Sequence, residues 1–236
     1  MNEPSNTPIG VGMSSAPAPF YQVWLKAITK PNPATYAELA SSPAAKASTA
    51  YLWVFVTSLV SYGLTAVIQF AVVLIGGGDS LGSSLISLIL GVPLQAGLAV
   101  LGFIISTAVV KWVSGLFKGQ RTFSFDQLAY VYGAITAPIT LIGIAIGSIA
   151  GFLWFVPVIG VFLGGGLILI LLIYLLALDV IAVKGIADLG WGQSITSVLA
   201  IPGLLFLCAC AVIVILTLTG GAVNDIFNSI NQSLGQ

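Results

Sequence analysis

The chain has 236 residues, of which 58% are hydrophobic and only 6% are charged, with seven basic and seven acidic side chains and no histidine. Soluble domains carry roughly a quarter charged residues, so this composition excludes an ordinary soluble domain and predicts an integral membrane protein. Nucleic acid is not an expected partner, because no run of Lys and Arg could neutralise several phosphates.

Residues 1–19 are rich in Pro, Ser, Ala and Gly. They lack the basic region and the apolar core of a signal peptide. A segment of this composition cannot build a hydrophobic core, so we expect a disordered tail.

Residues 20–49 predict an amphipathic cytoplasmic arm. In F-Y-Q-V-W-L-K-A-I-T-K, residues 20–30, apolar side chains recur at helical spacing, whereas Lys26 and Lys30 fall mostly elsewhere. Such a helix lies in the headgroup region, with Trp24 as an interfacial anchor. The arm either binds a cytoplasmic or membrane protein or only sets the depth of the chain, and we favour the second reading because interfacial helices commonly do no more.

Two further helix starts are predicted in the arm. Thr35 and Glu38 have the spacing of a capping box, in which a hydroxyl and a carboxylate each satisfy a free backbone N–H of the first turn. Ser42 followed by Pro43 has the pattern of an N-cap with proline at the first helical position, which predicts the start of the helix that leads into the first span.

Five apolar blocks follow, and each can cross a bilayer of about 30 Å hydrocarbon, which takes about 20 residues. The predicted spans within the membrane domain 50–218 are 50–76, 84–111, 127–150, 157–183 and 194–218. All the basic residues lie in segments that five crossings would place on the same side of the membrane: Lys26, Lys30, Lys46, Lys111, Lys118, Arg121 and Lys184. By the positive-inside rule, the all-α chain has a cytoplasmic N-terminus and a tail, 219–236, on the opposite side. Six spans, made by splitting one block, would scatter the basic residues over both faces.

The stretch G-Q-R-T-F-S-F-D-Q, residues 119–127, is the most polar connection between spans. Ser124 and Gln127 have capping-box spacing, and Asp126 lies near the positive end of the helix dipole. Arg121 is placed to meet lipid phosphates or Asp126. These side chains are therefore interpreted as a helix start rather than as a site.

Glycines recur every four residues in the third span, at Gly143, Gly147 and Gly151, and the spacing returns at Gly160 and Gly164. Helices approach closely along such faces. The pattern predicts a tight hairpin of the third and fourth spans. A glycine face can also mark self-association into a homo-oligomer, but we favour the hairpin because the connecting turn is short.

Polar side chains inside spans are candidates for function. Tyr132 needs a partner for its hydroxyl in hydrocarbon, and Gln69 and Gln95 lie in the first and second spans. Asp179 lies five residues before Lys184, about 7.5 Å along a helix, so it is within reach of interfacial water.

Charged neighbours suggest partners for two of these residues. We expect Asp179 to pair with Lys111 or Arg121 from the neighbouring turn, the alternative being a ligand for a coupling ion. Lys184 and Asp188 are four residues apart, the spacing of a same-face ion pair.

No catalytic or cofactor motif is found. The chain lacks a His base, a nucleophile elbow and a phosphate-binding loop, and its two cysteines, Cys208 and Cys210, do not form a Cys-x-x-Cys pattern. We therefore expect a protein that is not an enzyme and has no cofactor and no metal.

Three segments carry a family resemblance: V-W-L-K-A-I-T-K-P at 23–31, F-S-F-D-Q-L-A-Y-V-Y-G-A-I-T-A-P at 123–138, and L-D-V-I-A-V-K-G-I-A-D-L-G-W-G-Q-S-I at 178–195. In this order they resemble the Yip1 domain family of five-span proteins, over roughly residues 20–218. Eukaryotic members are associated with Rab-type GTPases and vesicle traffic, but their Asp-Leu-Tyr-Gly-Pro motif has no counterpart in residues 1–49. The resemblance thus implies the bacterial branch and the bacterial cytoplasmic membrane.

Two functions follow as hypotheses. The first is a non-enzymatic membrane scaffold or adaptor in membrane organisation or trafficking, which contacts the lipid bilayer and binds a protein through residues 20–49. The alternative is a small transporter or channel, with Gln69, Gln95 and Asp179 lining a pathway. Convergence of these three side chains on one hydrated cavity would favour transport.

Overall fold

The computed structural model describes residues 18–76, 81–117, 121–153 and 160–234, and every regular element in them is a helix. The elements are α1 (Phe20–Thr29), α2 (Pro33–Ala40), α3 (Ala47–Gly76), α4 (Leu81–Ile86), the π-helix η1 (Ser87–Gly91), α5 (Val92–Leu116), α6 (Phe125–Leu153), the π-helix η2 (Gly160–Gly164), α8 (Gly165–Ala187) and α9 (Trp191–Leu234). The predicted tail 1–19 falls outside the described residues, apart from its last two positions.

Five stretches of the described chain are long and apolar enough to cross a membrane. They are Ala47–Ile75, Ser87–Leu116, Phe125–Ser148, Phe162–Ala187 and Trp191–Ile215. The predicted all-α membrane protein with five spans is thereby confirmed. At the end of the bundle near the arm, each stretch extends a few residues beyond the predicted end, because the helices continue past the apolar block into polar residues; at the other end each stretch is a few residues shorter than predicted.

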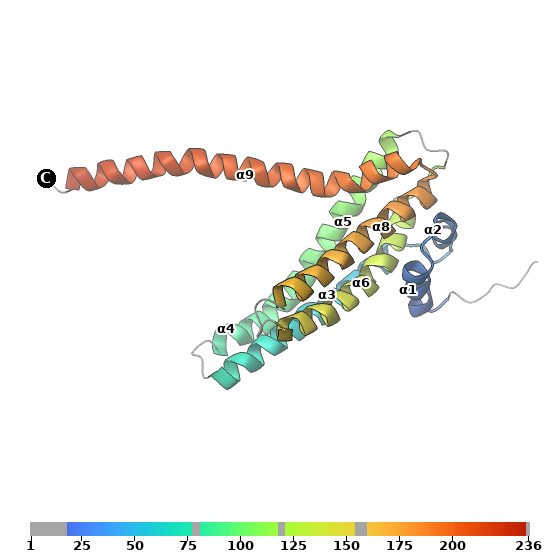
Figure 1. Ribbon diagram of the computed structural model, residues 1–236, viewed down its shortest axis with the longest axis horizontal. Coiled ribbons are helices and arrows are strands. Elements are labelled where there is room, and N and C mark those ends of the chain that lie inside the picture. Colours follow the sequence, from blue (N-terminus) through green and yellow to red (C-terminus); the bar gives the residue numbers. More distant parts are fainter. Residues whose placement is uncertain (1–17, 77–80, 118–120, 154–159, 235–236) are drawn as a thin grey trace, which may run out of the picture.

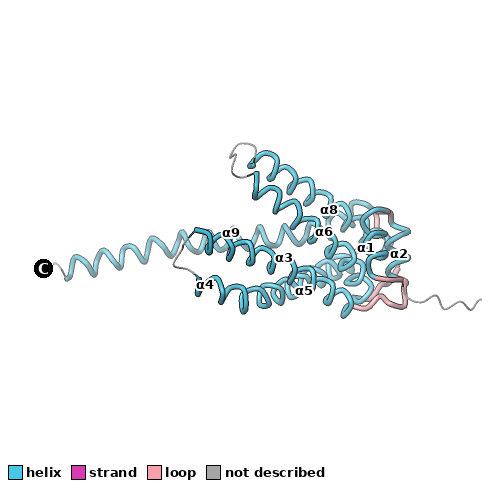
Figure 2. The backbone as a smooth tube through the Cα atoms, turned by 90° about the horizontal axis from the view of Figure 1, so that it is seen from below, coloured by secondary structure: helices cyan, strands magenta, loops and turns pink. Residues whose placement is uncertain are grey.

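The helix α6 lies at the centre of the bundle. In its membrane window 56% of the residues are buried, compared with 6% in the window of α3. Small residues on the first half of α6, including Gly133, Ala134 and Ala137, allow α3, α5, α8 and both arm helices to pack around it. Figure 2 shows α6 and α8 diverging from α3 and α5 with increasing distance from the arm.

The last helix leaves the bundle. The first part of α9 packs against α5 and α8, and the remainder extends away from the other helices (Figure 1). Its apolar side chains there, such as Phe206 and Ile213, are exposed, as expected for a lipid-facing surface. The helix continues to Leu234, so the predicted tail 219–236 is helical as far as it is described.

The arm packs against the bundle rather than lying apart from it (Figure 1). Val23 and Ala27 of α1 and Tyr36 of α2 belong to the same buried cluster as α6 and α8. The carbonyl of Ile28 accepts a hydrogen bond from the Tyr174 hydroxyl, near the middle of the span Phe162–Ala187. The face of α1 formed by Val23 and Ala27 is therefore covered by protein, whereas Phe20, Tyr21 and Leu25 stay exposed, and the headgroup location of this helix stays a prediction.

The start of α2 differs from its prediction. Its N-cap is Asn32, whose side-chain oxygen accepts from the Thr35 N–H at 2.7 Å, with Pro33 in the first turn. Glu38 reaches out of the helix instead and forms a salt bridge with Lys26, at 2.6 Å. Thr35 and Glu38 thus do not form a capping box, since an Asn followed by Pro provides a cap three residues earlier.

The start of α3 is also later than predicted. Ser42 and Pro43 lie in a turn, in which the Ala44 N–H donates to the Ser42 hydroxyl at 3.3 Å. The helix begins at Ala47, with the Lys46 carbonyl accepting the first bonds. Ser42 therefore caps a turn rather than the first span.

The capping box at the start of α6 is confirmed. The Ser124 N–H donates to Gln127 Oε1 at 2.8 Å, and the Gln127 N–H donates to Ser124 Oγ at 3.2 Å. Asp126 lies in the first turn, where the helix dipole favours a negative charge.

Replacing Ser124 with alanine is expected to lower the free energy of unfolding by about 0.5–2 kcal/mol, because the Gln127 N–H loses its acceptor. Thermal unfolding in detergent measures the change. Ser124→Asp, which keeps an acceptor at the N-cap, should retain wild-type stability, and equal losses in both variants would show that the cap does not contribute.

The contacts of the glycines differ from those predicted for a tight hairpin of the third and fourth spans. α6 and α8 are neighbours, and an added Cβ at Gly143 would meet Leu171 at 3.5 Å, but at Gly147 nothing lies within 4 Å. Among the described residues, none therefore packs against Gly147. The closest approaches occur at Gly133, which faces Ala50 of α3, and at Gly185, which faces the Pro33 backbone.

Candidate functional site: a polar cavity within the bundle

A cavity of about 380 Å³ lies between the spans, and all five of them contribute to its lining. Most of its lining residues, including Ser61 of α3, Thr136 of α6 and Ile201 of α9, fall near the middle of their spans. Six small hydroxyl side chains face it: Ser58, Ser61, Ser106, Thr107, Thr136 and Thr140. Hydroxyl groups at this depth need partners within the protein, because hydrocarbon offers polar groups none.

Among the described residues that line the cavity, Asp179 of α8 is the one that is charged. Its side chain is half-buried and forms no salt bridge or hydrogen bond with the described residues. Intramembrane carboxylates are expensive and are retained mainly at functional sites. Asp179 is therefore the central residue of the candidate site.

The predicted pairing of Asp179 with Lys111 or Arg121 is wrong. The Lys111 ammonium donates to the Phe123 carbonyl at 3.1 Å and lies 5.4 Å from the centre of the Phe123 ring. Arg121 is exposed and forms no ion pair with Asp126 within the described chain. Both cations belong to the end of the bundle, whereas Asp179 faces the cavity at a greater depth.

The predicted pair of Lys184 and Asp188 is also wrong. Asp188 ends α8 with a left-handed backbone conformation, φ 53°, which turns it off the helix face. The Lys184 ammonium instead donates to the Leu189 carbonyl at 3.3 Å and lies 5.0 Å from the centre of the Trp191 ring. No described cation therefore competes for the charge of Asp179.

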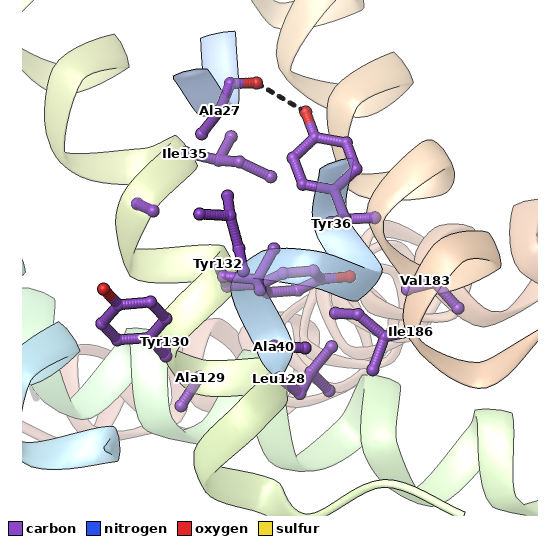
Figure 3. Packing of buried hydrophobic residues seen from close by; sticks show 14 of the residues in the cluster. Ala27, Tyr36, Ala40, Leu128, Ala129, Tyr130, Tyr132, Ile135, Val183 and Ile186 are labelled. Atoms are coloured by element: carbon purple, nitrogen blue, oxygen red, sulfur yellow. Dashed lines mark hydrogen bonds between the residues drawn. The ribbon is translucent and has the colours of Figure 1, made fainter. Parts of the chain in front are cut away.

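Tyr132 of α6 also lines the cavity. It is 5% exposed, and its buried hydroxyl has no hydrogen-bond partner among the described residues. In Figure 3 the hydroxyl points toward α8, near Val183 and Ile186. It lies near enough to Asp179 to interact with its charge. We predicted that the Tyr132 hydroxyl needs a hydrogen-bond partner, and the described chain does not provide one.

Tyr36 of α2 approaches Asp179 from the arm. The ring is fully buried, and the hydroxyl donates to the Ala27 carbonyl at 2.7 Å (Figure 3). Burial raises the pKa of the Tyr36 hydroxyl above its usual range, and the nearby Tyr174 and Asp179 raise that pKa further. The arm therefore covers the bundle on the side where Asp179 lies.

This raised pKa predicts that the wild-type protein loses stability in strong alkali. A folded-state pKa above the unfolded value of about 10 leaves stability unchanged below pH 10 and lowers it above, by up to about 1.4 kcal/mol per pH unit. Tyr36→Phe should show a shallower decline. Thermal unfolding of both proteins from pH 8 to pH 11 tests this, and parallel curves would contradict it.

The two predicted glutamines lie elsewhere. Gln69 lines a separate cavity of about 180 Å³, with Ala66, Ser83 and Ser87, and Gln95 is exposed on α5. Gln69, Gln95 and Asp179 therefore do not converge, and the expected shared pathway is wrong for the glutamines. Hydroxyl residues that the sequence did not single out surround Asp179 instead.

The predicted interface residues divide into two groups. Asp126, Arg121 and Lys30 are exposed. Lys26 is held by its salt bridge, and the half-buried Trp24 packs edge-on against Trp53, with ring centres 5.9 Å apart. Within the described chain, no group of three or more His, Cys, Asp or Glu residues could hold a metal ion.

Comparisons of the chain with protein-family models, curated proteins and solved structures found no match. The Yip1 resemblance therefore stays a prediction that rests on the three segments quoted above. Function has to be argued from the cavity.

Proposed function

We propose that the protein is a small membrane transporter in which a positively charged solute binds in the central cavity. The observation that carries the proposal is Asp179, a carboxylate within the span Phe162–Ala187 that faces a cavity lined in part by hydroxyl groups and has no cationic partner in the described chain. A carboxylate in a low-dielectric site attracts a cation more strongly than it would in water.

The arrangement of helices supports movement of a solute. Every span contributes to the cavity, so a change in the packing of any one span alters the site. Pro138 of α6 and Pro202 of α9 lie within helices and close to the lining residues Thr136 and Ile201. A proline removes a backbone hydrogen bond, which provides a place for a helix to bend.

The topology belongs to the same proposal. With five crossings, the two ends of the chain would lie on opposite sides of the membrane, and the positive-inside rule favours a cytoplasmic arm. The family resemblance favours a bacterial cytoplasmic membrane. The fully buried Tyr36 of α2 lies near Asp179, so the arm would lie against the cytoplasmic side of the bundle close to the cavity.

A membrane scaffold of the Yip1 type is the second candidate. The observation that favours it is an exposed apolar face on α1, formed by Phe20, Tyr21 and Leu25, each more than half exposed. This face is available to a lipid surface or to another protein. The scaffold role needs no cavity, however, and leaves the unpaired Asp179 without a task.

Charge movement in proteoliposomes tests transport. Rapid concentration jumps of sodium, potassium and alkylammonium chlorides are applied to reconstituted protein on a solid-supported membrane, where bound or transported cations give a transient current. We expect a current with wild-type protein for at least one cation, and none with Asp179→Asn. Asp188→Asn removes the same charge from the exposed end of α8 and should behave as wild type. Absence of any Asp179-dependent current would contradict transport.

A further inference from the structure

The charge of the central cavity restricts its ligand to a monovalent cation. Asp179 provides one negative charge, and no basic side chain lines the cavity. An anion would be repelled, and a divalent metal ion usually requires several carboxylate ligands. Neutralisation of one carboxylate by one positive charge removes most of the cost of holding it inside the membrane.

The hydroxyl groups restrict the ligand further. Thr107 donates to the Phe103 carbonyl at 2.8 Å and Thr140 donates to the Thr136 carbonyl at 2.9 Å, so these hydroxyl protons are used within their own helices. The remaining lone pairs are acceptors. Together with the carboxylate, the lone pairs of these two hydroxyls give the cavity acceptors that suit a ligand with N–H donors.

The size and the remaining walls indicate an organic ion rather than a bare alkali ion. A volume of about 380 Å³ lies within the usual range of small-molecule sites, roughly 300–1,000 Å³. The side chains of Val54, Phe103 and Ile201 line the cavity and give it an apolar side. Aromatic rings from Tyr62 and Tyr132 also line it, and ring faces attract organic ammonium groups.

We propose that the central cavity binds a small primary ammonium ion, with the ammonium group at the Asp179 carboxylate and a short alkyl group against Val54, Phe103 and Ile201. This inference rests on the proposed function and names its substrate class. The Tyr132 hydroxyl has no partner among the described residues, and the side chain lines the same cavity as Asp179, so this oxygen is available to accept from the ammonium group.

Binding of propylammonium chloride to the purified full-length protein in detergent tests the inference, by saturation-transfer NMR and by the shift of the thermal unfolding midpoint. The neutral analogue 1-propanol, tetramethylammonium chloride, which has no N–H donor, and sodium chloride serve as comparison ligands. Propylammonium should bind, and each of the other three should bind at least about 10-fold more weakly, because one charge-assisted or donor-dependent interaction is missing.

Variants locate the binding site. Asp179→Asn should weaken propylammonium binding by about 10- to 100-fold, and Tyr132→Phe by about 3- to 10-fold, as expected for the loss of a charged and of an ordinary hydrogen bond. Asp188→Asn should bind as wild type does. Tyr132→Phe removes an oxygen that has no partner in the free protein, so this variant tests binding even if Asp179→Asn were to fold poorly.

Three results would overturn the inference. The first is equal binding of 1-propanol and propylammonium, the second is equal affinity in wild type and both cavity variants, and the third is binding of sodium in place of propylammonium. The last result, combined with an Asp179-dependent sodium current, would remove the ligand class and leave cation transport standing. Propylammonium binding at Asp179 without any current would support the ligand class and contradict transport.

Discussion

Gly133→Ala is expected to destabilise the purified protein by about 1–3 kcal/mol, the usual cost of an extra methyl group in a packed core. A Cβ at this position would lie 2.6 Å from Ala50 Cβ and 2.9 Å from the Ala50 Cα. The second contact is with backbone, so the conflict is relieved only if α3 and α6 move apart. The higher helix propensity of alanine offsets at most about 1 kcal/mol of this cost.

Gly147→Ala is the matched control for this substitution. It makes the same change in the same helix, at a position where nothing lies within 4 Å of the new methyl group. Its thermal unfolding midpoint in detergent should equal or exceed the wild-type value. Equal midpoints for the Gly133 and Gly147 variants would mean that α3 and α6 are not in close contact at Ala50.

The number and positions of the spans follow directly from composition. Apolar blocks of more than 20 residues without internal charge have few alternatives to a transmembrane helix. The capping box of Ser124 and Gln127 was also predictable, because it depends only on residues three positions apart. Local patterns of this kind fail where two of them compete, as Asn32 does with Thr35 for the start of α2.

Packing between distant segments was not predictable from a single sequence. The glycine repeat at Gly143 and Gly147 is regular, yet the closest approaches are made by Gly133 and Gly185, which stand alone in the pattern. One of them faces a neighbouring span and the other faces the arm, at Pro33. A hydrophobic pattern shows that α1 has an apolar face, but it does not show whether lipid or protein covers that face.

The candidate site was found in part. Asp179 and Tyr132 are rare residue types within apolar spans, so both were identified from the sequence. Serine and threonine are common in membrane helices, where they bond to their own backbone, and only the fold shows that several of them surround Asp179. Gln69 and Gln95 are equally polar, but their positions on α3 and α5 direct them away from the central cavity.

The buried arm changes how a partner-binding role must be tested. Removal of residues 1–49 would take away Ala27 and Tyr36, both fully buried, and would expose the surface of α6 and α8 beneath them. A protein that no longer co-purifies after this truncation has therefore not been shown to bind the arm. Substitution of the exposed Phe20 and Leu25 by serine leaves the packed face intact and is the cleaner experiment.

Asp179→Asn is expected to increase the stability of the ligand-free protein by about 1 kcal/mol while it weakens cation binding by about 10- to 100-fold. An aspartate at the centre of a membrane helix costs about 2.5–3.5 kcal/mol on insertion scales, and Asp179, which lies between the middle and the end of the span Phe162–Ala187, incurs part of this cost. Nothing in the described chain offsets this through a salt bridge with Asp179. Asparagine has the same shape and no charge, so the variant removes the cost and keeps the packing of α8.

Thermal unfolding in detergent, without added cation, distinguishes the two roles that Asp179 could have. If a structural partner held the Asp179 carboxylate, the substitution would lower the free energy of unfolding of the protein by about 3–5 kcal/mol, because the partner would be left buried and unpaired. If the carboxylate instead serves to bind a ligand, the substitution raises the free energy of unfolding of the ligand-free protein. Such a trade-off between stability and activity is common at binding sites. Asp188→Asn, at the exposed end of α8, should change stability by less than about 0.5 kcal/mol. If Asp179→Asn lowers the free energy of unfolding by about 3–5 kcal/mol, the main support for a cation site in the cavity is therefore removed.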